Sequence, residues 1–590
     1  MGERTDAEQW WRHAVIYQVY PRSFADGDGD GIGDLVGVEA RLNYLVRLGV
    51  DAIWFTPWYA SPWADGGYDV ADYRRIDPRI GTLAQAEHLI AAAARRGVRV
   101  IVDIVPNHVS SQHPWFQAAL AAAPGSPERG RFWFRDGAGP AGDGLPTLWQ
   151  SSFHGQTWTR TTDPDGRPGQ WYLHLFTPEQ PDLNWDNPQV RAEHEDVLRF
   201  WFDRGVAGVR VDSATLCVKD PALPEEPGPG DPVAPGEHPF IDRDGVHDIY
   251  RAWRAIADAY DPPRLMVGEV WLPDVDRFAA YLRPDEMHTA FNFDFMAQPW
   301  QADALRRSID VTLGAHRQIG APPTWVLSNH DVTRPVTRYG RAQTGFAFAD
   351  KRFGVPTDLE LGTRRARAAA LITAALPGCL YIYQGDELGL PEDEQIPLEC
   401  IEDPMYARSG GVDPGRDGCR VPLPWEGDPR NNFGFSTPAA DAIARPSWLP
   451  QPAWWGRYAV QGQAGDPGSM LAFYRQILAL RRDIADLAGT GFAWLDGLPA
   501  TCLAFRRGRL ACIVNFADAP VRLPSGRILA ASGPLEAGRL GADTGAWIEL
   551  ADAATREAPA RDAAAREAPG QDAPTREAPA RDAPARGEAA

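Results

Sequence analysis

Three short apolar segments of the chain each end on an acidic residue. They are Gly208-Val-Arg-Val-Asp212, Leu265-Met-Val-Gly-Glu269 and Trp325-Val-Leu-Ser-Asn-His-Asp331. Each is too short and too rich in β-branched residues for a helix, and fits a strand buried on both faces. A buried parallel strand fixes the residue at its C-terminal end at the mouth of a barrel. Three such acids predict glycosyl chemistry, with a nucleophile, a proton donor and a group that stabilises transition-state charge.

The residues around these acids separate their roles. Arg210 lies two residues before Asp212 and faces the same side of its strand, so its charge favours the ionised carboxylate of a nucleophile. Glu269 has apolar neighbours on both sides, which favour the raised pKa of a proton donor. Asp331 follows His330 and is expected to stabilise the charged transition state. Any one of these acids alone could simply end a strand, but the set favours a site.

An alternation of strand-like and helix-like segments predicts the scaffold. Amphipathic patterns at 83–96 and 190–204 separate apolar runs. Eight such alternations favour an α/β fold in which a closed (β/α)8 TIM barrel carries the site. An open doubly wound sheet would need a Gly-rich phosphate turn, which the sequence lacks. The predicted strands are 15–20, 52–57, 98–105, 206–212, 264–270, 289–296, 324–331 and 380–384.

Insertions and appendages interrupt this alternation. We expect a small inserted domain after the third strand, a long Pro- and Trp-rich loop or subdomain after the eighth, and a C-terminal antiparallel β domain. From 552 to 590 the chain repeats every ten residues without an aromatic side chain, which predicts disorder. The predicted boundaries are 1–108 and 181–485 for the barrel, 109–180 for the inserted domain, 386–466 for the long loop and 486–551 for the β domain.

Composition limits the partners and the compartment. The chain has 590 residues, 44% of them hydrophobic, and a net charge of −20, which argues against binding nucleic acid or an anionic membrane. No apolar stretch approaches the ~20 residues that span a bilayer. The first residues lack the pattern of a signal peptide, and the six cysteines show no zinc-type spacing. We expect a cytoplasmic protein that acts on a small molecule, and the oligomeric state stays open.

Five motifs together resemble a known family. They are Asp103-Ile-Val-Pro-Asn107-His108, the segment ending at Asp212, Val-Gly-Glu269-Val, Asn329-His330-Asp331 and Gln180-Pro-Asp182-Leu-Asn184. In this order, over residues 10–550, the chain resembles an α-amylase-type glycoside hydrolase of family 13, in its α-glucosidase and oligo-1,6-glucosidase branch. The resemblance implies that Asp212 is the nucleophile, Glu269 the acid/base and Asp331 the transition-state stabiliser.

The same resemblance implies a set of substrate contacts. The residues expected to hold the glucose are Asp69, His108, Arg210, His330 and Arg420. Phe153 and Phe176 either line the side of the site that receives the leaving group or belong to the core of the inserted domain. Arg420 could also serve only as a loop anchor.

A glycine-rich acidic segment predicts a metal loop. Asp26-Gly-Asp28-Gly-Asp30-Gly-Ile32-Gly-Asp34 spaces carboxylates two apart, and hard oxygen ligands suit Ca²⁺, with Mg²⁺ as the competitor. Position twelve of the pattern is Gly37 where an EF-hand needs a glutamate, so a true EF-hand is not expected. The loop resembles the single calcium loop of oligo-1,6-glucosidases, which implies Asp26, Asp28, Asp30, the Ile32 carbonyl and Asp34 as ligands of a structural ion. A metal-free surface turn is the alternative.

Together these features predict a retaining, exo-acting α-glucosidase that works through a covalent glucosyl-enzyme. Ser213 follows the nucleophile, and by resemblance a small polar residue there favours α-1,4 over α-1,6 bonds. The long Trp-rich loop at 386–466 is expected to wall off a pocket for short substrates. The alternatives are a transglucosidase or a sucrose- or trehalose-type isomerase with the same intermediate. A non-catalytic barrel is disfavoured because all three acids are present.

Overall fold

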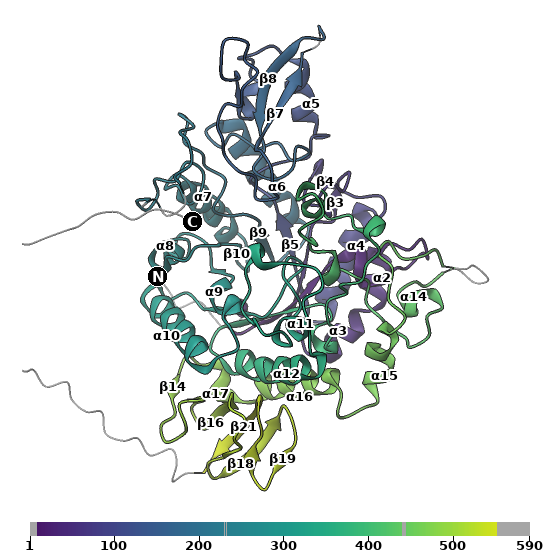
Figure 1. Ribbon diagram of the computed structural model, residues 1–590, viewed down its shortest axis with the longest axis vertical. Coiled ribbons are helices and arrows are strands. Elements are labelled where there is room, and N and C mark those ends of the chain that lie inside the picture. Colours follow the sequence, from purple (N-terminus) through teal and green to yellow (C-terminus); the bar gives the residue numbers. More distant parts are fainter. Residues whose placement is uncertain (1–8, 164, 229–230, 232, 439–443, 552–590) are drawn as a thin grey trace, which may run out of the picture.

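The computed structural model describes residues 9–163, 165–228, 231, 233–438 and 444–551. The ten-residue repeats predicted to be disordered lie outside these residues. Figure 1 shows a central body of strands ringed by helices, a projection at the top formed by α5, β7 and β8, and a β domain at the bottom near β16, β18 and β21.

Eight parallel strands form the central sheet. Its order is β11-β10-β9-β5-β2-β1-β13-β12, so the first barrel strand lies beside the last. The ends of this order meet where the Thr289 hydroxyl donates to the Pro322 carbonyl at 3.1 Å and contacts the Thr324 hydroxyl. The predicted α/β barrel is thereby confirmed. Its strands are β1 (Val15–Val19), β2 (Ala52–Phe55), β5 (Arg99–Ile104), β9 (Gly208–Val211), β10 (Leu265–Gly268), β11 (Thr289–Ala290), β12 (Thr324–Val326) and β13 (Cys379–Tyr383).

The barrel strands are buried on both faces, which explains their continuous apolar runs. Successive residues alternate between two cores. Ile16, Trp54 and Ile101 join a cluster inside the barrel, while Tyr17 and Ile53 join the larger cluster under the helices. A carboxylate that reaches the mouth of the barrel is therefore expected where a strand ends, because both faces of the strand are packed.

A ring of helices covers the outer face of the barrel (Figure 1). The amphipathic pattern at 83–96 forms a helix, α4 (Leu83–Arg95), and the Thr82 and Gln85 side chains cap its first turn reciprocally. The ring and its flanking turns comprise η1 (Trp10–Arg12), α1 (Pro21–Phe24), α2 (Leu35–Ala40), α3 (Leu42–Leu48), α4 (Leu83–Arg95), α6 (Pro188–Asp203), α7 (Val246–Asp258), α8 (Val275–Ala280), α10 (Ala302–Ile319), α11 (Pro335–Tyr339), η3 (Phe348–Asp350), α12 (Leu359–Ala375), α16 (Met470–Asp483) and α17 (Ala485–Ala488).

The sixth strand differs from its prediction. The segment 289–296 was expected to be extended throughout, but β11 stops at Ala290 and α9 (Phe293–Ala297) begins three residues later. Asn292 caps this helix, since its side-chain oxygen accepts the Phe295 N–H at 3.0 Å. The apolar residues of this segment are buried in either conformation, so the hydrophobic pattern did not distinguish them.

Between the third and fourth barrel strands the chain forms a small domain of its own. It holds α5 (Pro114–Ala121), η2 (Arg129–Arg131) and a three-stranded antiparallel sheet in the order β6-β8-β7. Its strands are β6 (Phe134–Arg135), β7 (Trp158–Thr162) and β8 (Pro168–Leu173). Trp133, Trp149 and Trp158 fill its core together with Phe240, which comes from the segment after β9. A short hairpin of β3 (Tyr59–Ala60) and β4 (Asp72–Ile76) follows the second barrel strand.

The long segment after β13 consists of turns and short helices. These are η4 (Asp386–Leu388), η5 (Leu398–Cys400), α13 (Pro404–Arg408), η6 (Asp417–Cys419), α14 (Asn431–Gly434), η7 (Trp455–Tyr458) and α15 (Val460–Ala464). Its polar side chains reach back to the barrel mouth, as described below. The segment is therefore part of the site's wall.

The C-terminal domain is antiparallel, as predicted. One sheet has the order β14-β15-β16-β21-β18 and the other β17-β20-β19. The Trp547 indole donates to the Leu371 carbonyl at 3.1 Å and attaches this domain to α12. The strands are β14 (Ala493–Trp494), β15 (Cys502–Arg507), β16 (Leu510–Asn515), β17 (Val521–Arg522), β18 (Gly526–Ala531), β19 (Leu535–Glu536), β20 (Arg539–Leu540) and β21 (Thr544–Leu550).

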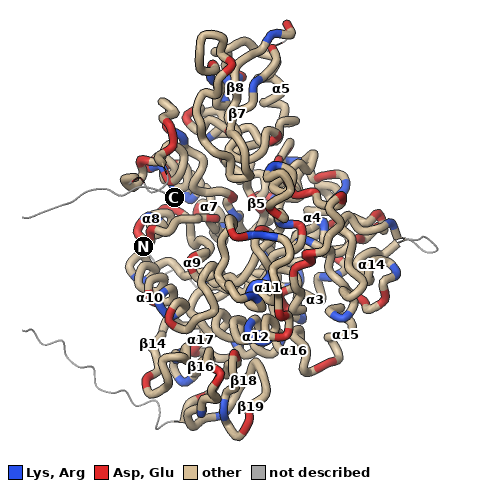
Figure 2. The backbone as a smooth tube through the Cα atoms, in the orientation of Figure 1, with Lys and Arg blue, Asp and Glu red and all other residues tan. Residues whose placement is uncertain are grey.

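Figure 2 shows acidic and basic positions interspersed along the backbone in every part of the fold. Among the described residues, none of the helices combines the length and the apolar character needed to cross a lipid bilayer. The six cysteines are all free, and five of them are buried.

One buried arginine ties the last helix of the barrel domain to the eighth strand. Arg481 donates to the carbonyls of Ala374 at 2.6 Å and Gly378 at 2.5 Å. The variant Arg481→Leu would leave these carbonyls without their donor, and we expect the free energy of unfolding to fall by about 2–4 kcal/mol. Urea denaturation would measure the change. The exposed neighbour Arg482 gives the matched control Arg482→Leu, and an equal loss in both variants would contradict the assignment.

Candidate active site

The three predicted acids meet at the C-terminal ends of the barrel strands. Asp212 directly follows β9, Glu269 directly follows β10, and Asp331 lies in the turn after β12. All three line one cavity of about 300 Å³. The barrel brings together residues more than a hundred positions apart because parallel strands all end at the same mouth.

Arg210 is the centre of the acidic cluster. Its side chain is fully buried in β9, and Nη1 lies 2.7 Å from Asp212 Oδ1 and 2.9 Å from Asp103 Oδ1. Nη2 lies 2.7 Å from Glu269 Oε2. One guanidinium thus compensates three buried carboxylates and holds two of them close together.

The surroundings give the acids different pKa values. Burial raises the pKa of Asp212 to about 6, against the opposing charge of Arg210. Burial also raises the pKa of Glu269 to about 7; Arg210 opposes the rise, and the charges of Asp212 and Asp331 add to it. Two neighbouring carboxyl groups with separated pKa values can divide the roles of base and acid.

Asp331 is held in the ionised form. Burial alone would raise its pKa, but His330 at 3.3 Å and two guanidinium groups keep that pKa well below its usual range. Arg416 Nη1 and Arg420 Nη2 lie 3.0 Å and 3.1 Å from Asp331 Oδ1. The Gln18 amide nitrogen lies 2.7 Å from His330 Nδ1, and because this amide donates, the His330 proton belongs on Nε2, facing Asp331.

An ion pair joins two of the segments that line the cavity. Asp65 Oδ1 lies 2.6 Å from Arg416 Nη2, and Asp65 Oδ2 accepts from the Gln180 amide at 3.0 Å. The same amide lies 3.0 Å from His108 Nε2. Burial lowers the pKa of His108 to about 4, so it is a neutral ring. Asp65, His108 and Arg416 all line the cavity and present hydrogen-bonding groups to it.

The expectation that Asp69 holds the sugar is not met by the structure. Asp69 lies outside the cavity lining, and its carboxylate accepts from the Ser61 hydroxyl and the backbone N–H groups of Ala64 and Asp65. The intervening glycines at 66 and 67 have φ of +57° and +109°, which reverses the chain between the two acids. Asp65 therefore takes the place predicted for Asp69.

Two predicted arginines also lie behind the cavity rather than in its lining. Arg420 donates to the His330 carbonyl at 2.8 Å and pairs with Asp331, so it orients these residues from behind. Arg210 likewise reaches the acids and not the cavity itself. Of the predicted sugar contacts, His108 and His330 line the cavity.

Aromatic and aliphatic side chains also line the cavity. Phe153 and Phe176 pack edge to face at 5.1 Å; Phe176 also contacts the His108 ring, and the Arg416 guanidinium lies 4.5 Å from the centre of the Phe153 ring. The remaining apolar lining comes from the segments after β9, β10, β12 and β13: Leu216, Ile241, Trp271, Phe348 and Met405. The cavity therefore offers aromatic surfaces directly beside its charged and polar groups.

Sequence reasoning missed Asp65, Tyr68, Trp271 and Arg416. Asp65 and Arg416 each stand four residues before the residue that was chosen, in the same motif, so the motif signal was correct and the position was not. The Tyr68 ring stacks on His330 at 5.2 Å, and its hydroxyl donates to Asp103 at 3.1 Å. An aromatic residue beside a glycine turn carries no signal for such a role.

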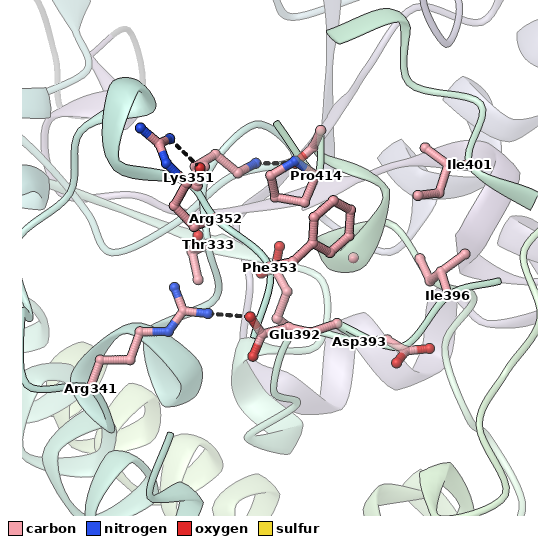
Figure 3. A pocket seen from close by; sticks show the side chains of 13 residues that line it. Thr333, Arg341, Lys351, Arg352, Phe353, Glu392, Asp393, Ile396, Ile401 and Pro414 are labelled. Carbon is pink, nitrogen blue, oxygen red and sulfur yellow. Dashed lines mark hydrogen bonds and ion pairs between the residues drawn. The ribbon is translucent and has the colours of Figure 1, made fainter. Parts of the chain in front are cut away.

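A second, small cavity of about 30 Å³ lies where two mouth loops meet (Figure 3). Lys351 donates to the Gly415 carbonyl, and Arg341 pairs with Glu394. The first contact joins the loop that carries Phe348 to the loop that carries Arg416. Phe348 and Arg416 line the active-site cavity, and the buried Lys351 side chain between their two loops thus helps to position both.

The acidic loop at 26–34 gathers part of its predicted ligand set. Asp26, Asp28 and Asp34 each offer an oxygen within 4.8 Å of the others. Asp30 is not part of this trio and accepts the Ile32 N–H at 2.8 Å. Backbone N–H groups of the glycines at 29 and 31 donate to Asp26, at 2.6 Å and 2.9 Å. Among the described residues no Lys or Arg ion pair with this trio is found, so its charge matches a divalent cation.

Comparisons with known proteins give the chain its relatives. Residues 18–488 match the alpha amylase catalytic domain, and residues 493–547 match a domain of unknown function, DUF3459. The chain is 35% identical to a probable alpha-glucosidase of Rhizobium meliloti (strain 1021), over 88% of this chain and 92% of that protein. It is 36% identical to a trehalose-6-phosphate hydrolase of Escherichia coli (strain K12), over 82% and 86%. It is 32% identical to an oligo-1,6-glucosidase of Parageobacillus thermoglucosidasius, over 80% and 84%.

Solved structures agree. An alpha-glucosyl transfer enzyme superposes with a TM-score of 0.77 at 33% identity, covering 91% of this chain and 99% of that chain. The trehalulose synthase of Pseudomonas mesoacidophila MX-45 superposes with a TM-score of 0.76 at 30% identity, covering 92% and 99%.

The Arg416 clamp generates a stability prediction. Its guanidinium pairs with the carboxylates of Asp65 and Asp403, which are buried, and of Asp331, which is partly exposed. The variant Arg416→Met would leave them undercompensated, and we expect a loss of about 3–5 kcal/mol in the free energy of unfolding. Denaturant unfolding would measure it. The exposed Arg352 on the adjacent loop gives the control Arg352→Met, which should change stability little. An unchanged stability of Arg416→Met would refute the clamp.

Proposed function

The chain belongs to the family of the alpha-amylase catalytic domain, and on that premise we propose that it is a retaining α-glucosidase. It removes terminal glucose from short α-glucosides through a covalent glucosyl-enzyme. The observation that carries this proposal is the pair of carboxyl groups, Asp212 and Glu269, which are held by one guanidinium and line one cavity. Retaining glycosidases need two such groups about 5–5.5 Å apart.

In the first step Asp212 is the nucleophile. Its carboxylate forms a bond to the anomeric carbon while the bond from that carbon to the leaving oxygen breaks, and Glu269 transfers its proton to that oxygen. The pKa values of about 6 and about 7 fit these roles, because between them Asp212 is ionised while Glu269 is protonated. Asp331, ionised throughout, faces the positive charge that develops on the sugar ring.

In the second step Glu269, now ionised, takes a proton from water as the water oxygen attacks the anomeric carbon. The bond to Asp212 breaks, and glucose leaves with its original α configuration. Asp65, His108 and Arg416 line the cavity, where they would hold the hydroxyls of the terminal glucose. Hydroxyls that meet paired acceptors and donors there fix the orientation of the sugar.

The cavity supports an exo-acting enzyme for short substrates. Its volume of about 300 Å³ is at the small end for ligand pockets. The Asp65–Arg416 ion pair joins the hairpin after β2 to the loop after β13. A cavity that is blocked at this pair would admit the end of a sugar chain and would exclude a glucan that passes through.

The charge of the cavity supports a neutral substrate. Among the described residues that line it, Arg416 is the one Lys or Arg side chain, and three carboxylates already pair with it. A phosphorylated sugar would need a cation free to meet its charge. We therefore assign neutral α-glucosides as substrates and not trehalose 6-phosphate, the substrate in the name of one relative.

Ser213 supports a preference for α-1,4 bonds. It lines the cavity with φ of +43°, and its backbone N–H donates to Glu269 Oε2 at 2.9 Å. A small side chain at this strained turn leaves room beside the acid/base for the second sugar. A branched side chain at positive φ would be strained and would fill that space.

A second candidate is a transglucosidase or disaccharide isomerase. The observation that favours it is the set of aromatic and aliphatic side chains that line the cavity, because an aromatic face stacks on a sugar acceptor better than it binds water. Two structural neighbours carry such names, an alpha-glucosyl transfer enzyme and a trehalulose synthase. Both candidates share the glucosyl-enzyme and differ in what attacks it.

A product-resolved NMR time course with maltose, isomaltose and sucrose tests both candidates. We expect α-glucose to appear first, faster from maltose than from isomaltose. The variant Asp212→Ala should lose all turnover and keep its melting temperature, while the exposed-site control Asp276→Ala stays active. New oligosaccharides or an isomerised disaccharide as main product would select the second candidate. First release of β-glucose, or activity in Asp212→Ala, would overturn the nucleophile assignment.

We further propose that the loop at 26–34 binds Ca²⁺ as a structural ion, with Mg²⁺ as its competitor. The trio of carboxylates Asp26, Asp28 and Asp34 supports this, since hard oxygen donors without a paired cation fit a divalent ion. Asp30 and the Ile32 carbonyl would complete the ligand set. The loop docks on the segment after β13, where the Asp26 N–H donates to the Phe435 carbonyl at 2.8 Å. A bound ion would hold these two segments together.

Chelation tests the ion. We expect EDTA to lower the melting temperature by several degrees, because a ligand present at 100 times its Kd contributes about 2.7 kcal/mol to stability. The initial rate at low temperature should stay within about twofold. The variant Asp28→Asn should abolish the difference between chelated and calcium-loaded protein in calorimetry. An immediate and reversible loss of rate on chelation would instead place a metal in the reaction.

A further inference from the structure

We propose that Trp271 is a positioning residue whose indole N–H holds the carboxyl group of Glu269 in line with the leaving oxygen. This inference rests on the proposed function, in which Glu269 is the acid/base. Trp271 lies two residues after Glu269, and its Nε1 donates to Glu269 Oε1 at 3.1 Å.

The Glu269 carboxyl group is held on both oxygens. Oε2 accepts the Ser213 backbone N–H at 2.9 Å and lies 2.7 Å from Arg210 Nη2. Oε1 has Trp271 as its partner among the hydrogen bonds of the described residues. Rotation about the bond to the carboxyl group is thus fixed at one oxygen by the barrel strands and at the other by the indole.

The indole itself is clamped by two aromatic rings. It stacks on Phe293 with the ring centroids 3.7 Å apart and the planes 2° from parallel, and meets the edge of Phe348 at 5.4 Å. Phe293 begins α9, and Phe348 begins η3 on the loop that Lys351 anchors. Stacking between aromatic rings stabilises this orientation of the indole.

Trp271 is also a partition between two cavities. One is the active-site cavity, and the other has a volume of about 500 Å³ and lies between the segment after β10 and the helices α9 and α10. Part of the indole faces each cavity. Its orientation therefore depends on the Phe293 stack, the edge contact with Phe348 and the hydrogen bond to Glu269.

The donors around Glu269 define what the contact does. Indole, guanidinium and backbone N–H groups donate and cannot accept, so they match the ionised carboxylate. The protonated carboxyl group needs one acceptor, and the leaving oxygen of the substrate supplies it. The proton passes to that oxygen as its bond to the anomeric carbon breaks. Trp271 keeps Oε1 oriented through this transfer and stabilises the carboxylate that results.

The indole N–H also affects the pKa of Glu269. The charged groups that face Glu269 are Arg210 and Asp212 from the β9 segment, Asp331 after β12 and Asp103 in β5. A hydrogen bond to the ionised form of a carboxyl group lowers its pKa. Removal of the Trp271 N–H therefore raises the pKa of Glu269 and moves the alkaline limb of the pH profile to higher pH.

The test is Trp271→Phe, which keeps an aromatic ring and removes the N–H. We measure kcat/KM against pH with maltose and with α-glucosyl fluoride, whose fluoride leaves without a proton. We expect about a tenfold loss for maltose, a change within about twofold for the fluoride, and an alkaline limb about 0.5–1 pH unit higher. A merely structural role would lower kcat/KM equally for both substrates and leave the alkaline limb in place. That result would overturn the proposal.

Two further variants complete the experiment. Trp494→Phe is the matched control, because the Trp494 indole also donates to a carboxylate, Asp310 at 2.7 Å, far from the site. This control should leave kcat/KM unchanged for both substrates. Phe293→Leu keeps the indole N–H and removes the ring on which the indole stacks. We therefore expect a smaller loss of kcat/KM that again affects maltose and not the fluoride. If Trp271→Phe fails to fold, the proposal is refuted when Phe293→Leu lowers kcat/KM equally for maltose and for the fluoride. Wild-type inactivity on both substrates would refute the proposed function instead.

Discussion

The buried guanidinium of Arg210 is the interaction on which the site depends. It sits fully buried in β9 against Asp103, Asp212 and Glu269, three carboxylates from three neighbouring strands. Without this charge the acids could not share a small buried space, because like charges in a medium of low polarity repel strongly. The barrel supplies the rigidity that makes the arrangement possible, since each strand is packed on both faces and cannot yield. Burial, in turn, raises the pKa of both reacting acids, and the charge of Arg210 opposes that rise.

A second layer of charge completes the cavity from outside the barrel. Arg416 and Arg420 come from the long segment after β13; both pair with Asp331, and Arg416 also pairs with Asp65. These arginines link the segment to the hairpin after β2 and to the turn after β12. The segment is long because it must cross the barrel mouth and present cations there. Its many short turns are consistent with this role, since no regular element could follow such a path.

Aromatic side chains line the cavity next to its charged and polar groups. Tyr68 stacks on His330, Phe176 contacts the His108 ring, and the Arg416 guanidinium lies 4.5 Å from the centre of the Phe153 ring. The Trp271 ring stacks on Phe293, and its N–H donates to Glu269. Aromatic rings thus serve both as walls and, through one indole N–H, as part of the proton-transfer apparatus.

The sequence by itself determined the barrel, the antiparallel C-terminal domain and the three acids at the strand ends. These follow from local patterns, because a strand buried on both faces is largely apolar and fixes the residue at its C-terminal end at the barrel mouth. Tertiary structure alone decided which of two nearby residues faces the cavity. Asp65 rather than Asp69, and Arg416 rather than Arg420, line it, since the direction of a side chain in a turn depends on backbone angles and on distant partners. The end of the sixth strand and the Trp271–Glu269 contact were decided in the same way, by packing between segments far apart in the chain.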